Sequence, residues 1–323
     1  MAGQDMAGSA RFGWTSGRGV PRGHDLRLPA LVTRRVRMTE VVPQPDRPIE
    51  PISSYEHDGL VFDVVDAGPA DGPIVLLLHG FPQRASSWRD VAAFLAEAGY
   101  RTLALDQRGY SPGARPRTRL SYTSDKLVGD VLALIECVGT PVHLVGHDWG
   151  AVVAWRLAAA HPTLVLSLTA VSVPHPSALA ASLMTSSQAL RSWYVLAVQP
   201  PALPELVARL APEALEALLR GSGMTEDELT SFRAEILADG ALSGALGWYR
   251  GAALDWHRTE HVTVPTTFVW SDGEQAIARR GAELTAQFVN GPYDFVVLEG
   301  ATHWIPTQAP RELAAIIGDR VGS

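Results

Sequence analysis

The chain has few of the residues that crosslink a protein or hold it in a membrane. Among its 323 residues there is one cysteine, Cys137, so an internal disulfide is impossible. Its longest uninterrupted apolar runs reach six residues, as at 193–198, whereas a membrane-spanning helix needs roughly 20. We therefore expect no membrane span, and we expect Cys137 to be a small core residue of an apolar helix.

Lysine and an excess of positive charge are also lacking. Lys126 is the only lysine among 27 basic residues, and the formal net charge is −7. Because domains that bind nucleic acids are usually basic, this charge argues against a nucleic-acid partner. Hydrophobic residues make up 46% of the chain and charged residues 19%, which is close to the globular average and excludes a disordered chain or a coiled coil. No set of metal ligands and no phosphate-binding loop is visible, so we expect no cofactor.

The first 50 residues differ from the rest of the chain. Glycine, serine and proline are scattered through them without a periodic apolar pattern. We expect a disordered, arginine-rich extension over 1–50, with Met38 as an alternative start. The segment lacks the apolar stretch and the cleavage site of a secretory signal, so we expect a cytoplasmic protein. Its arginines are Arg11, Arg18, Arg22, Arg27, Arg34, Arg35, Arg37 and Arg47.

Beyond this extension, short apolar runs alternate with helical segments. Asp58-Gly59 between two strand-like runs predicts a β-hairpin. Alternating strands and helices predict a mostly parallel sheet with helices on both faces. From 174 to 261 only helical patterning and prolines occur, which predicts an inserted helical lid over a core made of 51–173 and 262–323. The expected strands are 74–78, 102–105, 142–146, 165–171, 266–270 and 294–298, and the expected helices include 86–98, 123–138 and 149–160.

A tight strand-to-helix turn is predicted at Gly146-His147-Asp148-Trp149-Gly150. This is the spacing of the nucleophile elbow of the α/β-hydrolase fold, in which the residues two before and two after the nucleophile must be small. The turn lifts Asp148 to a helix N-terminus, where free N–H groups favour negative charge. We therefore predict Asp148 as the nucleophile, with an ordinary loop capped by Asp148 as the structural alternative.

An aspartate in this position narrows the chemistry. A carboxylate that attacks an ester or amide gives an anhydride, whereas attack on saturated carbon gives an alkyl-enzyme ester. The expected substrate has a strained or good leaving group on carbon, as in an epoxide or a halide. Hydrolysis of the ester then needs a water molecule activated by a histidine.

The loop after the strand at 74–78 reads His79-Gly80-Phe81-Pro82. In this fold that loop supplies one N–H group of the oxyanion hole, and the residue after the nucleophile supplies the other. We assign these two donors to Phe81 and Trp149. We also expect a cis Phe81-Pro82 peptide bond and a buried, hydrogen-bonded His79.

The other members of a catalytic triad are expected after the last two strands. His303 is the last histidine of the chain and follows the strand at 294–298, as the order nucleophile, acid, histidine requires. Asp272 and Glu274 both follow the strand at 266–270. The usual pattern G-x-x-D, here with Ser271 in place of glycine, favours Glu274 as the acid, and Asp272 is the alternative.

Taken together, these segments resemble the epoxide hydrolases of the α/β-hydrolase superfamily over residues 52–321. The resemblance implies two lid tyrosines whose O–H groups hold and protonate the epoxide oxygen, at Tyr194 and at Tyr249, the latter in a stretch close to the family's N-W-Y-R. The alternative is that both are packing residues. The matching stretches are His79-Gly80-Phe81-Pro82, Asp106-Gln107-Arg108-Gly109-Tyr110, Gly146-His147-Asp148-Trp149-Gly150, Trp193-Tyr194-Val195-Leu196-Ala197-Val198-Gln199, Gly247-Trp248-Tyr249-Arg250 and Gly300-Ala301-Thr302-His303-Trp304.

Some matched positions depart from the family or have a structural explanation. Glu274 stands where aspartate is commoner, and Ala151 stands where a third glycine is common. Asp106 and Arg108 match the family and are expected to fix a loop rather than to act on substrate.

The expected function is therefore the opening of an epoxide to a vicinal diol through an ester on Asp148, by a monomer or a homodimer. The apolar lid predicts a lipophilic substrate, on the basis of Trp193, Leu196, Val198, Leu203, Leu206 and Trp248. Two alternatives remain open. A haloalkane or haloacid dehalogenase would use the same aspartate, histidine and acid, but it needs a halide donor where Phe81 stands, or a pair of arginines where Trp149 and Val152 stand. The other is a non-catalytic, ligand-binding member of the fold.

Overall fold

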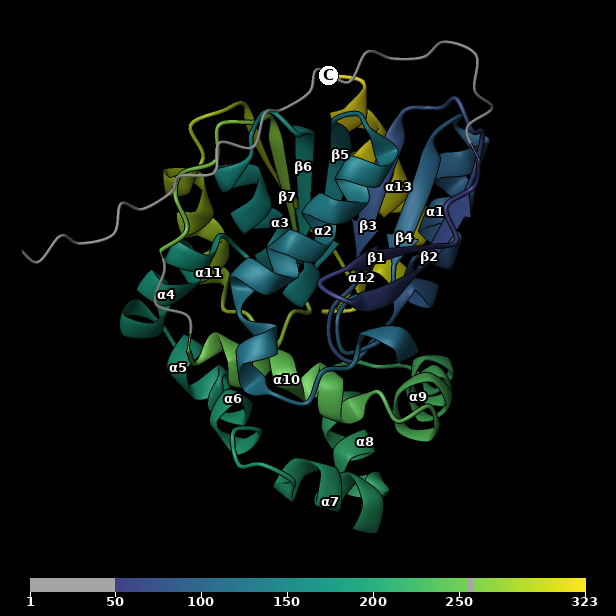
Figure 1. Ribbon diagram of the computed structural model, residues 1–323. Helices are drawn as coiled ribbons and strands as arrows, with labels where there is room; N and C mark the ends of the chain where they lie inside the picture. The colour runs from purple at the N-terminus through teal and green to yellow at the C-terminus, as the bar shows by residue number, and fades with distance from the viewer. Residues whose placement is uncertain (1–49, 255–257) are drawn as a thin grey trace, which may run out of the picture. The chain divides into compact units, whose positions relative to one another are not determined.

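A computed structural model describes residues 50–254 and 258–323. The expected extension over 1–50 and the alternative start at Met38 lie outside the described residues, apart from Glu50. In the described part, eight strands form one sheet in the order β1-β2-β4-β3-β5-β6-β7-β8 (Figure 1). The β1–β2 and β2–β4 pairs are antiparallel and the remaining pairs are parallel, as predicted. The strands are β1 (Ser54–His57), β2 (Leu60–Ala67), β3 (Ile74–Leu78), β4 (Arg101–Leu105), β5 (Val142–His147), β6 (Val165–Val171), β7 (Thr266–Ser271) and β8 (Tyr293–Leu298).

Strands β1 and β2 form a hairpin whose turn consists of two residues. Asp58 and Gly59 have φ angles of 55° and 72°, the left-handed pair that a two-residue hairpin turn requires. The turn sets His57 opposite Leu60. The predicted hairpin is therefore confirmed.

Two hydrophobic layers cover the sheet, one on each face (Figure 1). The side chains of β3 alternate: Leu76 and Leu78 belong to the layer that contains α2 and α3, and Val75 and Leu77 belong to the layer that contains α1 and α13. This alternation is the consequence of the two-residue period of a strand. The helices and turns of this part are η1 (Ala85–Trp88), α1 (Arg89–Glu97), η2 (Pro112–Ala114), η3 (Arg119–Tyr122), α2 (Ser124–Val138), α3 (Trp149–Ala160), α11 (Arg279–Leu284), η5 (Thr285–Phe288), α12 (Ile305–Gln308) and α13 (Pro310–Val321).

The prediction that Cys137 is a core residue is wrong. Cys137 is exposed near the C-terminal end of α2. The buried face of this helix is made by Leu127, Val131 and Leu134, and Cys137 lies to the side of that face. An apolar stretch in the sequence did not distinguish the two sides of the helix.

A helical segment is inserted between β6 and β7, and we call it the inserted segment. Its helices lie beyond the carboxyl ends of the strands, in the lower half of Figure 1. The Trp248 indole N–H donates to the Arg108 carbonyl at 2.6 Å, and the Ser86 hydroxyl donates to Glu235 at 2.6 Å; both bonds tie the inserted segment to the core loops. The helices are α4 (Pro176–Thr185), α5 (Gln188–Arg191), α6 (Trp193–Ala197), α7 (Leu203–Leu210), α8 (Pro212–Gly221), α9 (Glu226–Phe232), the π-helical η4 (Arg233–Ala238) and α10 (Leu242–Ala252).

Most of the apolar residues from which the sequence predicted a lipophilic substrate do not face the site. Trp193, Leu196, Leu203 and Leu206 are exposed to solvent, whereas Trp248 is buried. Most of the apolar residues that suggested a lipophilic substrate therefore lie on the outer surface of the inserted segment. Of the helices in the described part of the chain, none has the length and apolar character needed to cross a bilayer.

Candidate active site

The turn between β5 and α3 presents Asp148 at the carboxyl edge of the sheet. Asp148 has φ 50° and ψ −119°, a conformation that costs free energy for any residue other than glycine and that typifies functional turns. A Cβ atom at Gly146 would lie 2.4 Å from the Gly150 carbonyl oxygen, and one at Gly150 would lie 2.1 Å from the Leu78 carbonyl oxygen. Only glycine fits at these two positions, which is the physical reason for their spacing around Asp148.

Backbone donors hold the Asp148 carboxylate in place. The Phe81 N–H donates to Asp148 Oδ2 at 2.8 Å, and the Trp149 N–H also hydrogen-bonds this carboxylate. The peptide bond between Phe81 and Pro82 is cis, as predicted. Burial raises the pKa of Asp148, but the hydrogen bond and charge of His303 outweigh it, so the net pKa lies below its usual value. The carboxylate is therefore ionised at neutral pH.

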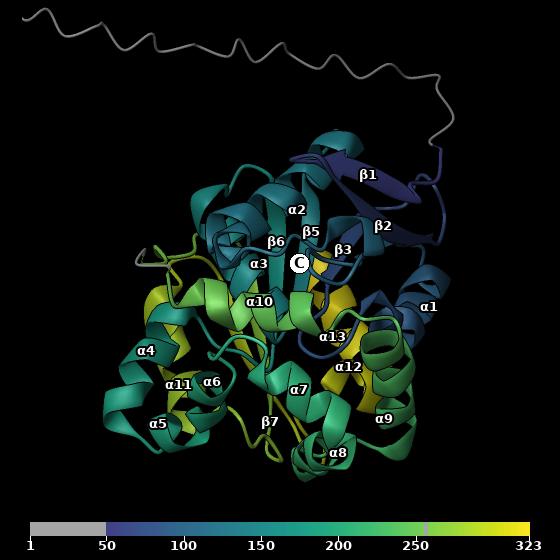
Figure 2. The same ribbon diagram turned by 60° about the horizontal axis from the view of Figure 1, so that its bottom comes forward.

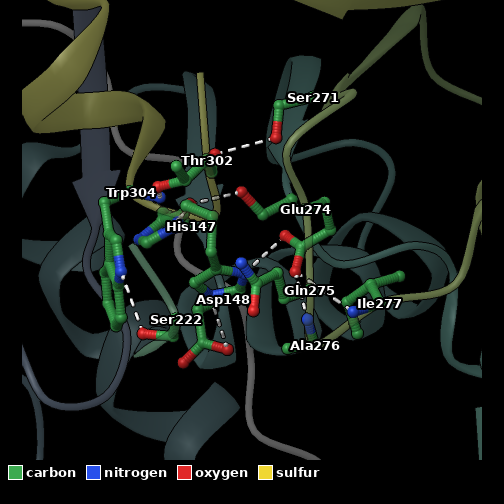
Figure 3. A network of polar contacts seen from close by, with 12 residues as sticks. His147, Asp148, Ser222, Ser271, Glu274, Gln275, Ala276, Ile277, Thr302 and Trp304 are labelled. Carbon is green, nitrogen blue, oxygen red and sulfur yellow. Dashed lines mark hydrogen bonds and ion pairs between the residues drawn. The ribbon is translucent and has the colours of Figure 1, made fainter. Parts of the chain in front are cut away.

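His303 lies between two carboxylates. Its Nε2 atom is 3.4 Å from Asp148 Oδ1, and its Nδ1 atom is 2.6 Å from Glu274 Oε2. The second Glu274 oxygen accepts N–H bonds from Ala276 at 2.6 Å and Ile277 at 3.1 Å, and Figure 3 shows the Glu274 carboxylate pointing toward both. Glu274 thereby fixes the orientation of the imidazole ring.

The two carboxylates determine the protonation of His303. Burial lowers its pKa, but the charges and hydrogen bonds of Glu274 and Asp148 outweigh burial and raise the pKa to about 10. In the free protein His303 is therefore an imidazolium at neutral pH. Esterification of Asp148 would remove one of the two negative charges, so the pKa of His303 would fall after the first chemical step.

The contacts of the two candidate acids differ. Glu274 is buried against His303, as described above. Asp272 is exposed, and its Oδ1 atom accepts the Gly300 N–H at 2.8 Å. The structure thus brings Glu274 to His303, and Asp272 instead fixes the turn after β8.

Two tyrosines of the inserted segment face this carboxylate. Tyr249 of α10 is buried, and its ring lies 4.9 Å from Trp149 and 5.3 Å from Phe81 in edge-to-face contacts. The ring of Tyr194, on α6, lies 6.0 Å from that of Tyr249. Burial is the main cause that raises the pKa of both phenols; the Asp148 charge comes next for Tyr194, and the neighbouring Tyr194 and then Asp148 come next for Tyr249. Both tyrosines are therefore protonated donors near Asp148.

The sequence and the fold agree with proteins of known family. A family model described as the alpha/beta hydrolase fold matches residues 73–310. Epoxide hydrolase A of Mycobacterium tuberculosis is 30% identical over 305 residues, which cover 80% of this chain and 94% of that protein. The chain belongs to the epoxide hydrolases of the α/β-hydrolase fold family.

Other epoxide hydrolases show the same similarity. Human epoxide hydrolase 4 is 32% identical over 266 residues, covering 78% of this chain and 73% of that protein. Among solved structures, epoxide hydrolase A from Mycobacterium thermoresistibile superposes with a TM-score of 0.72 at 27% identity, covering 84% of this chain and 97% of that one. Epoxide hydrolase VrEH1 from Vigna radiata gives a TM-score of 0.72 at 28% identity, covering 85% of this chain and 98% of that one.

Three residues that match the epoxide hydrolases shape loops around the site. His79 is buried, and burial lowers its pKa to about 4; its Nε2 atom accepts the Gln107 N–H at 3.2 Å. Asp106 accepts the Ala85 N–H at 2.8 Å. Arg108 donates two bonds of 2.7 Å to the buried Asp130. These contacts agree with the predicted structural roles.

The sequence reasoning missed His147, which holds the backbone of His303 in this epoxide hydrolase. Its Nε2–H donates to the His303 carbonyl at 2.8 Å, and the Ser172 hydroxyl donates to the same oxygen at 2.8 Å. Burial and the His303 charge lower the pKa of His147 to about 3, so it stays neutral. In the sequence, its position next to Asp148 at the end of a buried strand could have indicated this role.

Among the described residues no cluster of three or more His, Cys, Asp or Glu side chains could hold a metal ion.

Proposed function

We propose that this epoxide hydrolase opens a small-molecule epoxide to a vicinal diol through a covalent ester on Asp148. The observation that carries the proposal is the arrangement around one carboxylate: N–H donors on one oxygen, His303 beside the other, and Tyr194 and Tyr249 nearby as neutral donors. Nucleophile, proton donors and base all meet at one point, as the reaction requires.

In the first step, Asp148 attacks a ring carbon of the epoxide. The Phe81 N–H donates to Oδ2, so the oxygen that forms the new C–O bond is Oδ1, which lies 3.4 Å from His303 Nε2. The ring C–O bond breaks, and its electron pair goes to the departing oxygen. Tyr194 and Tyr249 donate hydrogen bonds to that oxygen, and one of them gives it a proton. Donors already in place stabilise the charge as it develops and need no reorganisation.

In the second step, water hydrolyses the ester. Once Asp148 is esterified, the proton on His303 is held by Glu274 alone, and the imidazole releases it through solvent to the tyrosinate that the first step produced, which restores the phenol. Neutral His303 then accepts a proton from the water that attacks the ester carbonyl. The N–H groups of Phe81 and Trp149 stabilise the resulting oxyanion, because they already point at this carboxyl group. Collapse of the intermediate releases the diol and restores the Asp148 carboxylate and the His303 imidazolium.

The same contacts bear on the dehalogenase alternative. A halide leaving group has no oxygen to protonate, so Tyr194 and Tyr249 would have no role. The Trp149 side chain, the one candidate halide donor beside the nucleophile, is hydrogen-bonded to Tyr249. The site therefore supports epoxide opening over halide displacement.

The proposal also covers the substrate class, the cellular compartment, the oligomeric state and the cofactor. Aromatic side chains of Phe81, Trp149 and Trp248 lie next to the nucleophile or its tyrosines, which favours an epoxide with an apolar substituent. We propose catalysis in the cytoplasm by a monomer or a homodimer, without a cofactor.

Trapping the ester tests the proposal. The full chain is mixed with excess styrene oxide, quenched within one turnover, digested and analysed by mass spectrometry. We expect the substrate mass on the peptide that contains Asp148, and no adduct in Asp148→Ala. Asp272→Asn is the matched control and should retain the adduct. Turnover of a bromoalkane instead of the epoxide would favour a dehalogenase, and binding without any turnover would favour a ligand-binding protein.

A further inference from the structure

An exposed apolar surface covers the outside of the inserted segment. Of the fourteen large apolar side chains that are exposed in the described part of the chain, nine lie between residues 183 and 210. Met184 is 90% exposed, Leu190 80% and Leu196 76%. Single exposed apolar residues are ordinary, but a group of this kind on one segment typifies an interaction surface. We call the group the apolar band: Leu183, Met184, Leu190, Trp193, Leu196, Leu203, Leu206, Val207 and Leu210.

The apolar band lies at the end of the folded unit that carries the catalytic tyrosines. Helices α4 to α7 occupy the lower end of Figure 1, and Figure 2 turns this end toward the viewer. Tyr194 faces Tyr249 from the short helix α6, and Trp193 and Leu196 of the same helix face solvent. A surface that covered the band would therefore lie one helix away from the reacting groups.

The charges around the apolar band distinguish a membrane from a second copy of the chain. Glu205 is the only acidic residue between 176 and 212, and Arg250 neutralises it through bonds of 2.7 and 2.9 Å. Arg209 is exposed within the band, and the next acid, Glu213, stands at its border in α8. The chain as a whole carries a net charge of −7. Over the described residues 183–210, the band thus carries an exposed arginine and no unpaired carboxylate, which suits an anionic surface, whereas the band of a second copy would offer no unpaired carboxylate to Arg209.

We propose that the apolar band docks on the surface of an anionic lipid bilayer. Its apolar side chains enter the boundary between headgroups and acyl chains, and Arg209 lies at the level of the anionic headgroups. A bilayer concentrates apolar molecules, so docking there would bring the substrates of the proposed function close to α6. The docking itself does not depend on catalysis.

Sedimentation with vesicles tests the docking separately from activity. The full chain, without epoxide, is mixed with phosphatidylcholine vesicles that contain phosphatidylglycerol. We expect wild-type protein to bind and the triple variant Met184→Ser, Leu190→Ser, Leu210→Ser to bind at least tenfold more weakly, because each buried apolar side chain adds about a factor of ten. The matched control is Leu120→Ser with Leu166→Ser, two exposed apolar residues outside the inserted segment, which should bind as the wild type does.

Further measurements separate charge and self-association. Arg209→Glu should weaken binding to the anionic vesicles and leave binding to pure phosphatidylcholine unchanged. The proposal is overturned if wild-type protein stays in the supernatant, or if the triple variant binds as well as the wild type. A dimer in sedimentation velocity that the triple variant dissociates, without vesicle binding, would assign the band to a second copy. Styrene oxide turnover of the triple variant, expected at the wild-type rate, shows that it is folded.

A second, independent observation concerns Gln188 at the start of α5. This side chain is buried, and its amide oxygen accepts the Ala278 N–H at 2.7 Å. Its amide nitrogen donates to the Ala276 carbonyl at 2.9 Å and to the Ser192 hydroxyl at 3.0 Å. Ala276 in turn donates its N–H to Glu274. One amide therefore connects the loop that holds Glu274 to the turn that precedes Tyr194.

We infer that Gln188 is a positioning residue that couples the inserted segment to the triad acid. Gln188→Met removes the hydrogen bonds at similar volume, so the Glu274 loop and the turn before α6 should both lose their fixed positions. We expect single-turnover rates of both ester formation and ester hydrolysis to fall at least tenfold, and the pH at which hydrolysis is half-maximal to shift.

The matched control uses the other glutamine of this region. Among the described residues, Gln199 donates to the Val195 and Tyr249 carbonyls at 3.0 Å and has no hydrogen bond to the Glu274 loop, so Gln199→Met should affect ester formation alone. Unchanged rates of both steps in Gln188→Met, or a fall in thermal stability without a change in the pH profile, would refute the coupling. Should Gln188→Met fail to fold, Gln188→Asn, which keeps the amide on a shorter side chain, is tested against the same outcomes.

Discussion

Removing the hydroxyl group of Tyr249 should slow epoxide opening by about two orders of magnitude while the protein stays folded. The side chain is buried, and burial raises the pKa of its phenol well above the usual value. The group is therefore a neutral donor at neutral pH. Tyr249→Phe keeps the ring contacts with Phe81 and Trp149 and removes the hydroxyl group, both as a donor to the substrate and as the acceptor of the Trp149 indole N–H.

The magnitude follows from the position of the donor in a dry site. A preorganised hydrogen bond to a developing oxyanion stabilises the transition state by about 3 kcal/mol, and each 1.36 kcal/mol or so changes a rate tenfold. Tyr194 is less buried than Tyr249, so Tyr194→Phe should cost somewhat less. The double variant should lose more than the product of the two effects, because both donors serve one oxygen and in each single variant the remaining donor compensates in part for the missing one.

Single-turnover kinetics provide the assay. The Trp149 ring lies 4.9 Å from the Tyr249 ring, and the Trp248 ring lies 6.0 Å from the Trp149 ring. Because these tryptophans lie close to the reacting groups, their fluorescence should report ester formation in a stopped-flow instrument. Tyr110→Phe is the matched control: Tyr110 is a buried tyrosine near the site, in contact with Trp248, and should react at the wild-type rate.

Two outcomes would refute the reasoning. Ester formation at the wild-type rate in both single variants would show that neither phenol assists ring opening. An equal loss with a halide substrate would show that the tyrosines act on packing, since a halide leaves without a proton.

Three further predictions use the same kinetics or equilibrium unfolding. His303→Gln should form the ester but not hydrolyse it, so mass spectrometry should find a stable adduct; inactive and unmodified protein would contradict the two-step scheme. Glu274→Gln should slow ester hydrolysis strongly and Asp272→Asn only mildly, because only Glu274 contacts His303; the opposite order would transfer the acid role to Asp272. The pKa of His303 rises from 6.5 to about 10 on folding, so its contribution to stability is complete below pH 6.5 and is lost as the pH rises toward about 10. Urea denaturation of the wild type should therefore show a free energy of unfolding that declines over this pH range, and the decline should be smaller in His303→Gln. An equal decline in both proteins would contradict this prediction.

The local parts of this protein could be predicted from short windows of sequence. The hairpin at Asp58-Gly59 and the elbow at Asp148 depend on backbone angles and on space for a Cβ atom, and both constraints act within a few residues. The alternation of apolar runs with amphipathic segments gave the sheet, because periodicity reports which side of an element is covered. Tyr194 and Tyr249 were predicted from family resemblance, since periodicity alone does not distinguish a donor from a packing residue, and their role as donors stays a prediction.

The contacts between distant parts of the chain were decided by the tertiary structure. The sequence pattern favours Glu274 over Asp272 as the acid but leaves both open, and the packing of the loops after β7 and β8 brings Glu274 to His303 and Asp272 to Gly300. The support of His303 by His147 depends on the same packing. Burial was decided in the same way. The sequence predicts Cys137 in the core and an apolar lid over a lipophilic substrate, but Cys137 and the lid residues Trp193, Leu196, Leu203 and Leu206 are exposed. Sequence determines backbone geometry and periodicity locally, whereas burial and pairing depend on which surfaces meet when the whole chain folds.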